Sequence, residues 1–242
     1  HVHPMAGRGG DYAAAFAAAA AAMDEAGIRK MVLLPPPQVQ ANQMFDFETL
    51  AAAAQGNPAR FAFLGGGGSL NVMLHEAAKA GGVSESLRSR FEARARQILA
   101  GGAAGFGEIA VHHLALRPGH PYESAPADHP LLLALADIAA NGDAMLDLHF
   151  DPVAADSRIP AWGSAFDNPA ELRANLPAFE RLLEHNRKAR VIWAHAGSDM
   201  LGFWTPDLSR RLLAKHPNLF MSLRVDFGRA PQAVFEERDW PQ

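Results

Sequence analysis

The sequence predicts an α/β protein made of repeated βα units, an incomplete (β/α)8 barrel. Segments with strand composition alternate with helical segments along the 242 residues. The predicted strands end near residues 3, 34, 64, 108, 149, 195 and 225, so each unit has the size of a βα module. Seven parallel strands fit either a doubly wound sheet or a barrel without its eighth strand. No glycine-rich dinucleotide fingerprint follows the first strand, and polar residues gather at strand carboxyl ends, which favours the barrel.

The first half of the chain contains signals for three strands separated by helices. Residues 12–26 are rich in alanine and form a helix that Asp11 can cap and Gly27 can end. Three consecutive prolines stop the strand predicted for residues 28–34. The elements that follow are a helix at 47–55, a strand at 60–64 leading into four glycines at 65–68, and a helix at 84–99.

The second half continues the alternation with four more strands. These are short apolar runs at residues 103–109, 144–149, 190–194 and 219–225. Helices are predicted at 131–140, after Asp128 or His129, and at 206–215. Asn168-Pro169-Ala170-Glu171 has the cap, first-turn proline and third-position glutamate of a helix start, and Pro177 is expected to restart that helix.

Composition narrows the classes of function. Apolar residues make up 49% of the chain, enough for the core of one domain spanning residues 1–242. The net charge of −4 gives no reason to expect nucleic acid or membrane as a partner. The absence of cysteine excludes disulfides, thiolate metal sites and cysteine nucleophiles. We expect a small-molecule substrate and a cytoplasmic location, and assembly into a homo-oligomer stays open.

The ends of the chain predict missing segments. The chain begins at His1, directly on a candidate ligand, and ends at Gln242, just past a loop-like segment. We expect both ends to be cut, so that the start of strand one and all of strand eight lie outside the sequence. A signal peptide could lie in the missing segment before His1.

Four histidines occupy the ends of predicted strands. His1 and His3 are two residues apart, so an extended strand points both the same way. His149 and His195 each end a later apolar strand, and Glu108 ends the strand between. Neutral imidazoles on a rigid scaffold, with carboxylates nearby, are suitable ligands for a divalent metal. Each residue also has a simpler explanation, namely a core histidine or, for Glu108, an ion pair with an arginine.

As an ordered set, these motifs resemble the amidohydrolase superfamily. The motifs are His1-x-His3, Gly107-Glu108-Ile109, His149 and His195-Ala196-Gly197, and the similarity is greatest to the amidohydrolase-related branch of metal-dependent hydrolases and decarboxylases. The resemblance implies one or two divalent ions, usually zinc. It implies that His1, His3, Glu108, His149 and His195 bind metal and that His149 and His195 serve in catalysis.

The resemblance also implies a general base that this chain lacks. In the family this base is an aspartate after strand eight, which the sequence does not reach. Asp199 follows His195 on the strand-six loop and is not expected to replace that aspartate.

Three further residues are candidates for binding substrate. His112 follows strand four together with His113, Arg224 ends strand seven, and Trp162 lies in the long loop at 150–167. An arginine can bind a carboxylate through two hydrogen bonds, although an ion pair with Asp226 is an equal alternative. A surface histidine and a packing tryptophan are the corresponding alternatives. The remaining histidines are expected at the surface: His75, His120, His129, His185 and His216.

The expected activity is metal-dependent hydrolysis. A metal-activated water would attack a C–N or C–O bond in an amide, lactone or ester. One alternative is nonhydrolytic decarboxylation of an aromatic or unsaturated acid with the same metal ligands. Gly107-Glu108-Ile109 also resembles a phosphoesterase branch. A noncatalytic metal-binding barrel remnant is the alternative from a different class.

Overall fold

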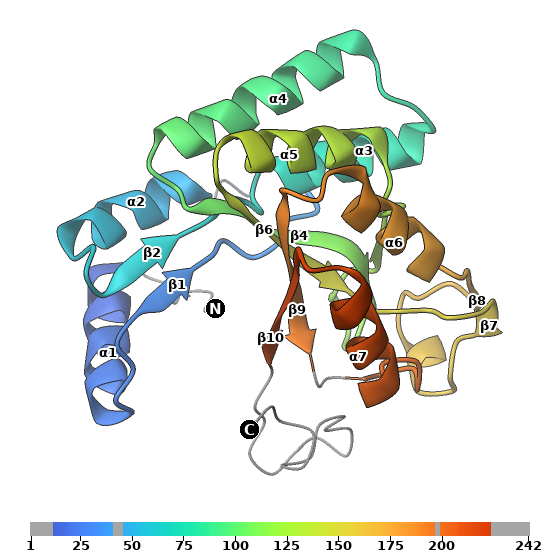
Figure 1. Ribbon diagram of the computed structural model, residues 1–242. Helices are drawn as coiled ribbons and strands as arrows, with labels where there is room; N and C mark the ends of the chain where they lie inside the picture. The colour runs from blue at the N-terminus through green and yellow to red at the C-terminus, as the bar shows by residue number, and fades with distance from the viewer. Residues whose placement is uncertain (1–11, 41–45, 197–198, 224–242) are drawn as a thin grey trace. The chain divides into compact units, whose positions relative to one another are not determined.

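A computed structural model describes residues 12–40, 46–196 and 199–223 (Figure 1). Contacts between Cα atoms divide the chain into two compact units, one with residues 1–73 and 84–109 and one with residues 74–83 and 110–242. Two elements run from one unit into the other, helix α3 (Leu70–Ala80) and strand β4 (Gly105–His113). The expectation of one domain over the whole chain stays a prediction.

Among its described residues, the first unit contains two parallel strand pairs and three helices of its own. Its elements are α1 (Tyr12–Glu25), β1 (Met31–Leu33), α2 (Phe47–Gly56), β2 (Phe61–Phe63), β3 (Gly65–Gly66) and α4 (Glu85–Ala100). Strand β1 pairs with β2, and β3 pairs with the beginning of β4, where Gly65 lies opposite Phe106. Phe91 and Ile98 are buried on α4, while most of its other side chains are at least partly accessible.

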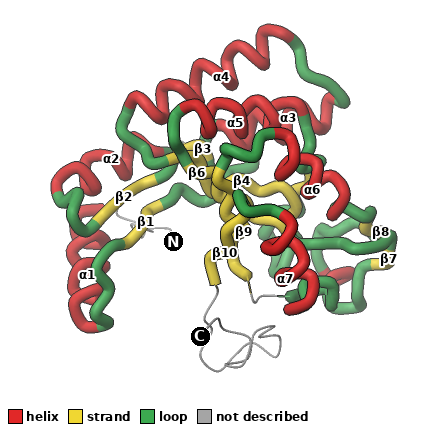
Figure 2. Tube along the Cα trace, viewed as in Figure 1, coloured by secondary structure: helices red, strands yellow, loops and turns green. Residues whose placement is uncertain are grey.

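The second unit is built on parallel strands joined through helices. Its elements are β5 (Glu123–Ser124), α5 (Pro130–Asn141), β6 (Met145–Phe150), β7 (Ser157–Arg158), η2 (Gly163–Ala165), β8 (Glu171–Leu172), α6 (Leu176–His185), β9 (Arg190–Ala196), α7 (Pro206–Lys215) and β10 (Leu219–Leu223). The strand order is β10-β9-β6-β4, and β5 pairs antiparallel with the end of β4. Figure 2 shows β6, β9 and β10 side by side. Parallel strands in this order require the helical crossovers that the alternating sequence predicted.

Aromatic rings fill the core of the second unit. Trp193 stacks on Trp204 with ring centroids 4.2 Å apart, and Phe150 stacks on Phe179 at 4.4 Å. The indole N–H of Trp193 donates to the Phe150 carbonyl oxygen at 2.7 Å, which ties β9 to the end of β6. The end of β6, where His149 lies, is therefore anchored by buried packing.

Two sequence predictions about elements are wrong. Helix α6 begins at Leu176, and residues 171–172 form strand β8 instead of a first helical turn. Asn168 does not cap a helix, because its side chain bonds both the N–H and the carbonyl of Ala115. Strand β4 continues to His113, where a loop was expected, because β5 folds back and pairs with His112 and His113. Helix α3 was not predicted.

Three histidines expected at the surface are buried. His75 donates from Nε2 to the Ala110 carbonyl oxygen at 2.8 Å. His129 caps α5, where its Nδ1 accepts from the Leu131 N–H. His216 directly follows α7 and is fully covered. Histidine is amphipathic, so a local pattern does not distinguish a buried cap from an exposed side chain.

None of the described helices combines the length and apolar character needed to cross a membrane. A cytoplasmic location stays a prediction.

Candidate metal centre

Histidines gather where three parallel strands of the second unit end. His112 and His113 are the last residues of β4, His149 is next to last on β6, and His195 is next to last on β9. Because parallel strands end at the same edge of a sheet, the rings of His113, His149 and His195 lie next to one another there, and His112 is joined to this group through Asp151. We call them, with Asp151 just after β6, the histidine cluster.

His149 is the centre of the histidine cluster. Its ring centroid lies 4.4 Å from that of His113 and 5.2 Å from that of His195. Potential ligand atoms of His149 and His195 lie within 4.8 Å of each other. The His149 side chain is 18% exposed, so it is accessible from solvent while most of the ring is covered. Neutral imidazole nitrogens at this separation fit two ligands of one divalent ion.

Asp151 provides the negative charge beside these rings. Its Oδ2 lies 3.6 Å from His149 Nε2 and accepts the Leu114 N–H at 2.9 Å. Burial alone would raise the pKa of Asp151, but the adjacent His149, together with His112 and His113, lowers it to about 2. Asp151 is therefore ionised at neutral pH and can hold His149 in one orientation.

His113 is held in its neutral form. Burial, and then the charge of His149, lower the pKa of His113 from 6.5 to about 4. Its Nδ1 lies 3.1 Å from the Pro121 carbonyl oxygen. Since a carbonyl only accepts, Nδ1 carries the proton and Nε2 keeps its lone pair. His113 is thus a neutral base whose ring also lies against His120, with centroids 4.5 Å apart.

His112 is fixed by two hydrogen bonds. Its Nδ1 donates to the Asp151 carbonyl oxygen at 2.7 Å, and its Nε2 accepts from the Tyr122 hydroxyl at 3.4 Å. Burial lowers the pKa of His112 and raises that of Tyr122. The surface alternative for His112 is therefore wrong, while substrate binding by this residue stays a proposal.

His195 lies in an irregular part of β9. The pairing with β10 shifts register between Met221 and Leu223, so β9 has one extra residue there. His195 has a φ of +61°, and its N–H donates to Ser222 Oγ at 3.3 Å. A non-glycine residue in this region is strained, and bulges of this kind redirect side chains near functional sites.

The remaining predicted site residues lie on β4, in loops, or outside the described part of the chain. Glu108 is buried on β4, in the part of the strand that belongs to the first unit. Trp162 packs against a small cluster of Leu114, Val153 and Leu172. His1, His3 and Arg224 lie outside the described residues. Asp199 accepts the N–H groups of the next turn, at Leu201 and Gly202.

Asp151 was not among the site residues predicted from the sequence. One signal was present, since His149 and Asp151 are two residues apart and an extended chain points both the same way. The contact of His113 with His149 had no sequence signal, because 36 positions separate these residues along the chain (149 − 113). Only the pairing of strands brings them together.

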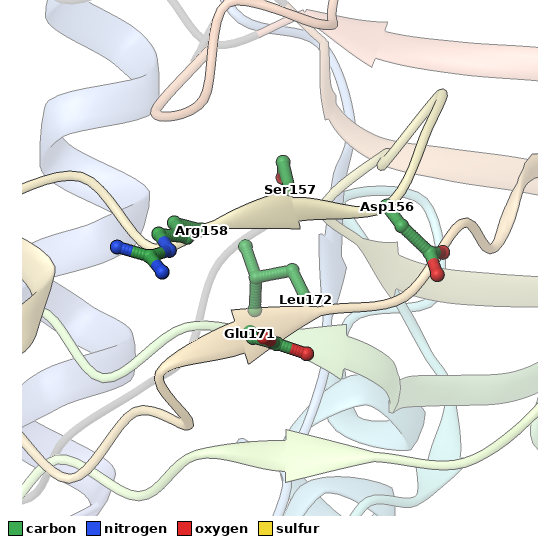
Figure 3. A pocket seen from close by; sticks show the side chains of 5 residues that line it. All are labelled: Asp156, Ser157, Arg158, Glu171 and Leu172. Atoms are coloured by element: carbon green, nitrogen blue, oxygen red, sulfur yellow. The ribbon is translucent and has the colours of Figure 1, made fainter.

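A pocket lies elsewhere in the second unit, at the β7–β8 hairpin. Figure 3 shows its lining residues, Asp156, Ser157, Arg158, Glu171 and Leu172. It contains none of the predicted site residues. Arg158 and Glu171 are exposed there, so the pocket resembles a surface depression more than an enclosed site for chemistry.

Comparison of the sequence with protein-family models gave no match, and neither did comparison with curated proteins. Solved structures do match. Dihydroorotase from Saccharomyces cerevisiae, in complex with 5-fluoroorotic acid, has 13% identity and a TM-score of 0.52, with 92% of this chain and 54% of that chain covered. This chain therefore spans about half the length of that enzyme.

Two decarboxylase structures match with lower scores. One is 2,6-dihydroxybenzoate decarboxylase from Rhizobium, with 14% identity, a TM-score of 0.45, and 91% of this chain and 83% of that chain covered. The other is dihydroxybenzoic acid decarboxylase from Polaromonas with bound manganese and 2-nitroresorcinol, with 14% identity, a TM-score of 0.44, and coverage of 92% and 81%.

The matched proteins are enzymes of the amidohydrolase superfamily, whose fold is the (β/α)8 barrel. The parallel, helix-connected strands of this chain agree with the match to dihydroorotase. The predicted fold class is confirmed as α/β, with parallel, helix-connected strands similar to those of the dihydroorotase structure. The predicted resemblance to the amidohydrolase superfamily agrees with these structural matches, which show the fold alone.

Proposed function

We propose that the protein is a metal-dependent hydrolase that cleaves a C–N or C–O bond of a small organic molecule. The observation that carries this proposal is the meeting of His149 and His195 at the sheet edge, with potential ligand atoms within 4.8 Å of each other. The ionised Asp151 beside His149 adds the kind of second partner that orients metal-binding histidines. An amide, a lactone or an ester is the proposed substrate class.

The proposed ligands extend the described pair with residues implied by the family resemblance. His149 and His195 would hold the ion together with His1, His3 and Glu108. The ion is proposed to be zinc, as one or two ions. When bound, a divalent cation supplies Lewis-acid polarisation of the scissile carbonyl and makes water more acidic.

The described side chains have separable tasks in this proposal. Asp151 keeps His149 oriented and would stabilise positive charge on its ring, at 3.6 Å, if His149 takes up a proton. His113 offers a lone pair at Nε2, next to His149, for a hydrogen bond from water or substrate. His112, Trp162 and Arg224 are the proposed substrate contacts. Burial around the histidine cluster limits water and strengthens each of these interactions.

Metal content and reaction type test the proposal together. Purified protein, His149→Asn, His195→Asn and the exposed control His185→Asn are loaded with zinc, dialysed and analysed for metal. We expect metal in the wild type and the control and a loss in the two cluster variants. Wild-type protein without metal would contradict the proposal.

A second measurement separates the reactions. Panels of esters, lactones and amides are followed by product formation, and aromatic carboxylic acids by release of carbon dioxide. Hydrolysis that disappears in His195→Asn supports the proposal. Carbon dioxide release without hydrolysis would favour a decarboxylase instead, and bound metal without any turnover would favour a noncatalytic barrel.

A further inference from the structure

A second group of potential metal ligands lies outside the histidine cluster. Glu180 and Glu184 are one turn apart on α6, and His216 directly follows α7. One potential ligand atom from each of the three lies within 4.8 Å of the other two. All three residues belong to the second unit.

The ammonium group of Lys215 lies between the two carboxylates. Lys215 Nζ is 2.5 Å from Glu180 Oε2 and 3.0 Å from Glu184 Oε1. The other oxygen of Glu180 accepts from Arg211 at 2.8 Å, which holds the carboxylate in place. The position between Glu180 and Glu184 thus attracts a cation, and a lysine of the same chain provides one.

His216 gives the independent sign of a ligand. Its side chain is 0% exposed, and neither ring nitrogen has a hydrogen-bond partner among the described residues. Nε2 faces Glu180 Oε2 at 3.6 Å, just beyond hydrogen-bond distance. A buried imidazole without hydrogen-bond partners destabilises the folded protein. A bound ion is one kind of partner that removes this cost.

The spacing suits tetrahedral coordination. Ligand atoms about 2.0–2.1 Å from zinc at tetrahedral angles are about 3.3 Å from each other. The separation of 3.6 Å between His216 Nε2 and Glu180 Oε2 needs only a small adjustment. The Glu184 side chain is 42% exposed and can move to complete the group, which leaves a fourth position for water.

We propose that Glu180, Glu184 and His216 form a binding site for a divalent transition-metal ion of the zinc class, in which Lys215 occupies the place of the ion. A doubly charged ion displaces the ammonium, whose long side chain is 46% exposed and free to turn into solvent. The imidazole favours zinc over magnesium or calcium, which prefer oxygen ligands. The bound ion links α6 to the end of α7.

Zinc titration of the whole protein by calorimetry tests this site. The variants are Glu184→Gln, Lys215→Gln and His216→Gln, with Glu76→Gln on α3 as the matched exposed control. We expect one zinc equivalent in wild type and control that is absent from Glu184→Gln and His216→Gln. Lys215→Gln should bind that equivalent roughly tenfold more tightly, because a competing charge has been removed. Magnesium should not compete for it.

The lysine variant makes the test decisive. If the three residues form only an ion-pair cluster, Lys215→Gln leaves zinc binding unchanged, and this result would overturn the proposal. Equal stoichiometry in the wild type and Glu184→Gln would also overturn it. Because Glu184 and Lys215 are partly exposed, these two variants keep the test valid even if His216→Gln unfolds. The histidine cluster is intact in every variant, so the result is independent of the proposed function.

Discussion

His149 shows at the scale of single residues how the candidate centre is built. Its own strand supplies Asp151 two positions later, and neighbouring strands supply His113 and His195. The negative charge of Asp151 raises the pKa of His112 and His113, whereas burial of these two rings lowers it by more. Asp151 stays ionised with its pKa at about 2, while His113 stays neutral with its pKa at about 4. At neutral pH the cluster therefore holds Asp151 as a carboxylate and His113 as a neutral imidazole, the forms in which these two side-chain types bind metal.

We predict that Asp151→Asn weakens metal binding at the histidine cluster. The substitution keeps the shape of the side chain but removes the charge beside His149 Nε2. Loss of a partner that orients a ligating histidine typically lowers metal affinity about 10- to 100-fold. Competition with a chromophoric chelator measures the change. The control is Asp156→Asn, an exposed aspartate paired with Arg173, and equal affinities in the two variants would contradict the prediction.

At the scale of elements, one buried carboxylate joins three segments of the first unit. Asp46 caps α2 through a 2.7 Å bond from the Phe47 N–H, and the same oxygen accepts the Gly66 N–H at 2.6 Å. The second oxygen accepts from the Ser69 hydroxyl and from Arg94 on α4, at 3.1 Å for the arginine. Helices α2 and α4 and strand β3 are thus tied to one side chain.

We predict that Asp46→Asn destabilises the protein by about 2 to 4 kcal/mol. The asparagine leaves the partly buried guanidinium of Arg94 without one charged partner and offers fewer acceptors to the surrounding donors. Urea denaturation followed by circular dichroism measures the free energy of unfolding. Asp24→Asn serves as control, because its ion pair with Arg60 is exposed and such pairs contribute little. A similar effect for both variants would refute the role of Asp46.

The glycine run at 65–68 is a second feature at the scale of elements. Its first two residues form β3, so this part is paired strand and not a loose loop. A Cβ at Gly67 would lie 2.6 Å from the Pro35 carbonyl oxygen and 2.8 Å from that of Pro36. Both are backbone atoms and cannot turn away. The glycine therefore permits close backbone approach next to the carboxyl end of β1.

We predict that Gly67→Ala lowers the free energy of unfolding by about 1 to 3 kcal/mol, the usual cost of overpacking. Gly82→Ala is the matched control, since a Cβ there meets no atom within 4 Å and the substitution reduces the entropy of the unfolded chain. Thermal melts of both variants check the contrast. A Gly67→Ala protein as stable as Gly82→Ala would contradict the prediction, because it would show that the Pro35 backbone can move away from the new Cβ at little cost in free energy.

For the whole molecule, buried neutral histidines couple stability to pH. Burial is the main cause that lowers the pKa of His75 from 6.5 to about 4, and His113 is lowered to a similar value. The unfolded chain binds protons at these positions below about pH 6.5, whereas the folded protein does so only near pH 4. Stability from this source is fully present above pH 6.5 and is lost as the pH falls toward 4.

We predict that His75→Gln reduces the acid sensitivity of the protein. Glutamine can still donate to the Ala110 carbonyl oxygen but does not titrate. Each pKa unit corresponds to about 1.4 kcal/mol, so His75 alone accounts for up to about 3 kcal/mol between pH 6.5 and 4. Unfolding free energies at several pH values test this, with the exposed His185→Gln as control. Parallel pH curves for the wild type and His75→Gln would count against it.

The sequence by itself determined the main alternation of strands and helices, apart from α3 and the short strands, and the strand-end positions of His149 and His195. These features depend on local periodicity, capping residues and the length of apolar runs, as in α4 and α7. Each of these features is encoded within a short stretch of sequence. The fold class followed from this alternation, and the family resemblance followed from the short motifs at the strand ends.

Tertiary structure alone decided which side chains meet and which are buried. His113 contacts His149 only because β4 and β6 end together, and β4 reaches His113 only because β5 folds back on it. The burial of His75 and His216 likewise depends on what packs over them. Such contacts join residues far apart in the chain, so their energies depend on register and packing, which no local pattern contains.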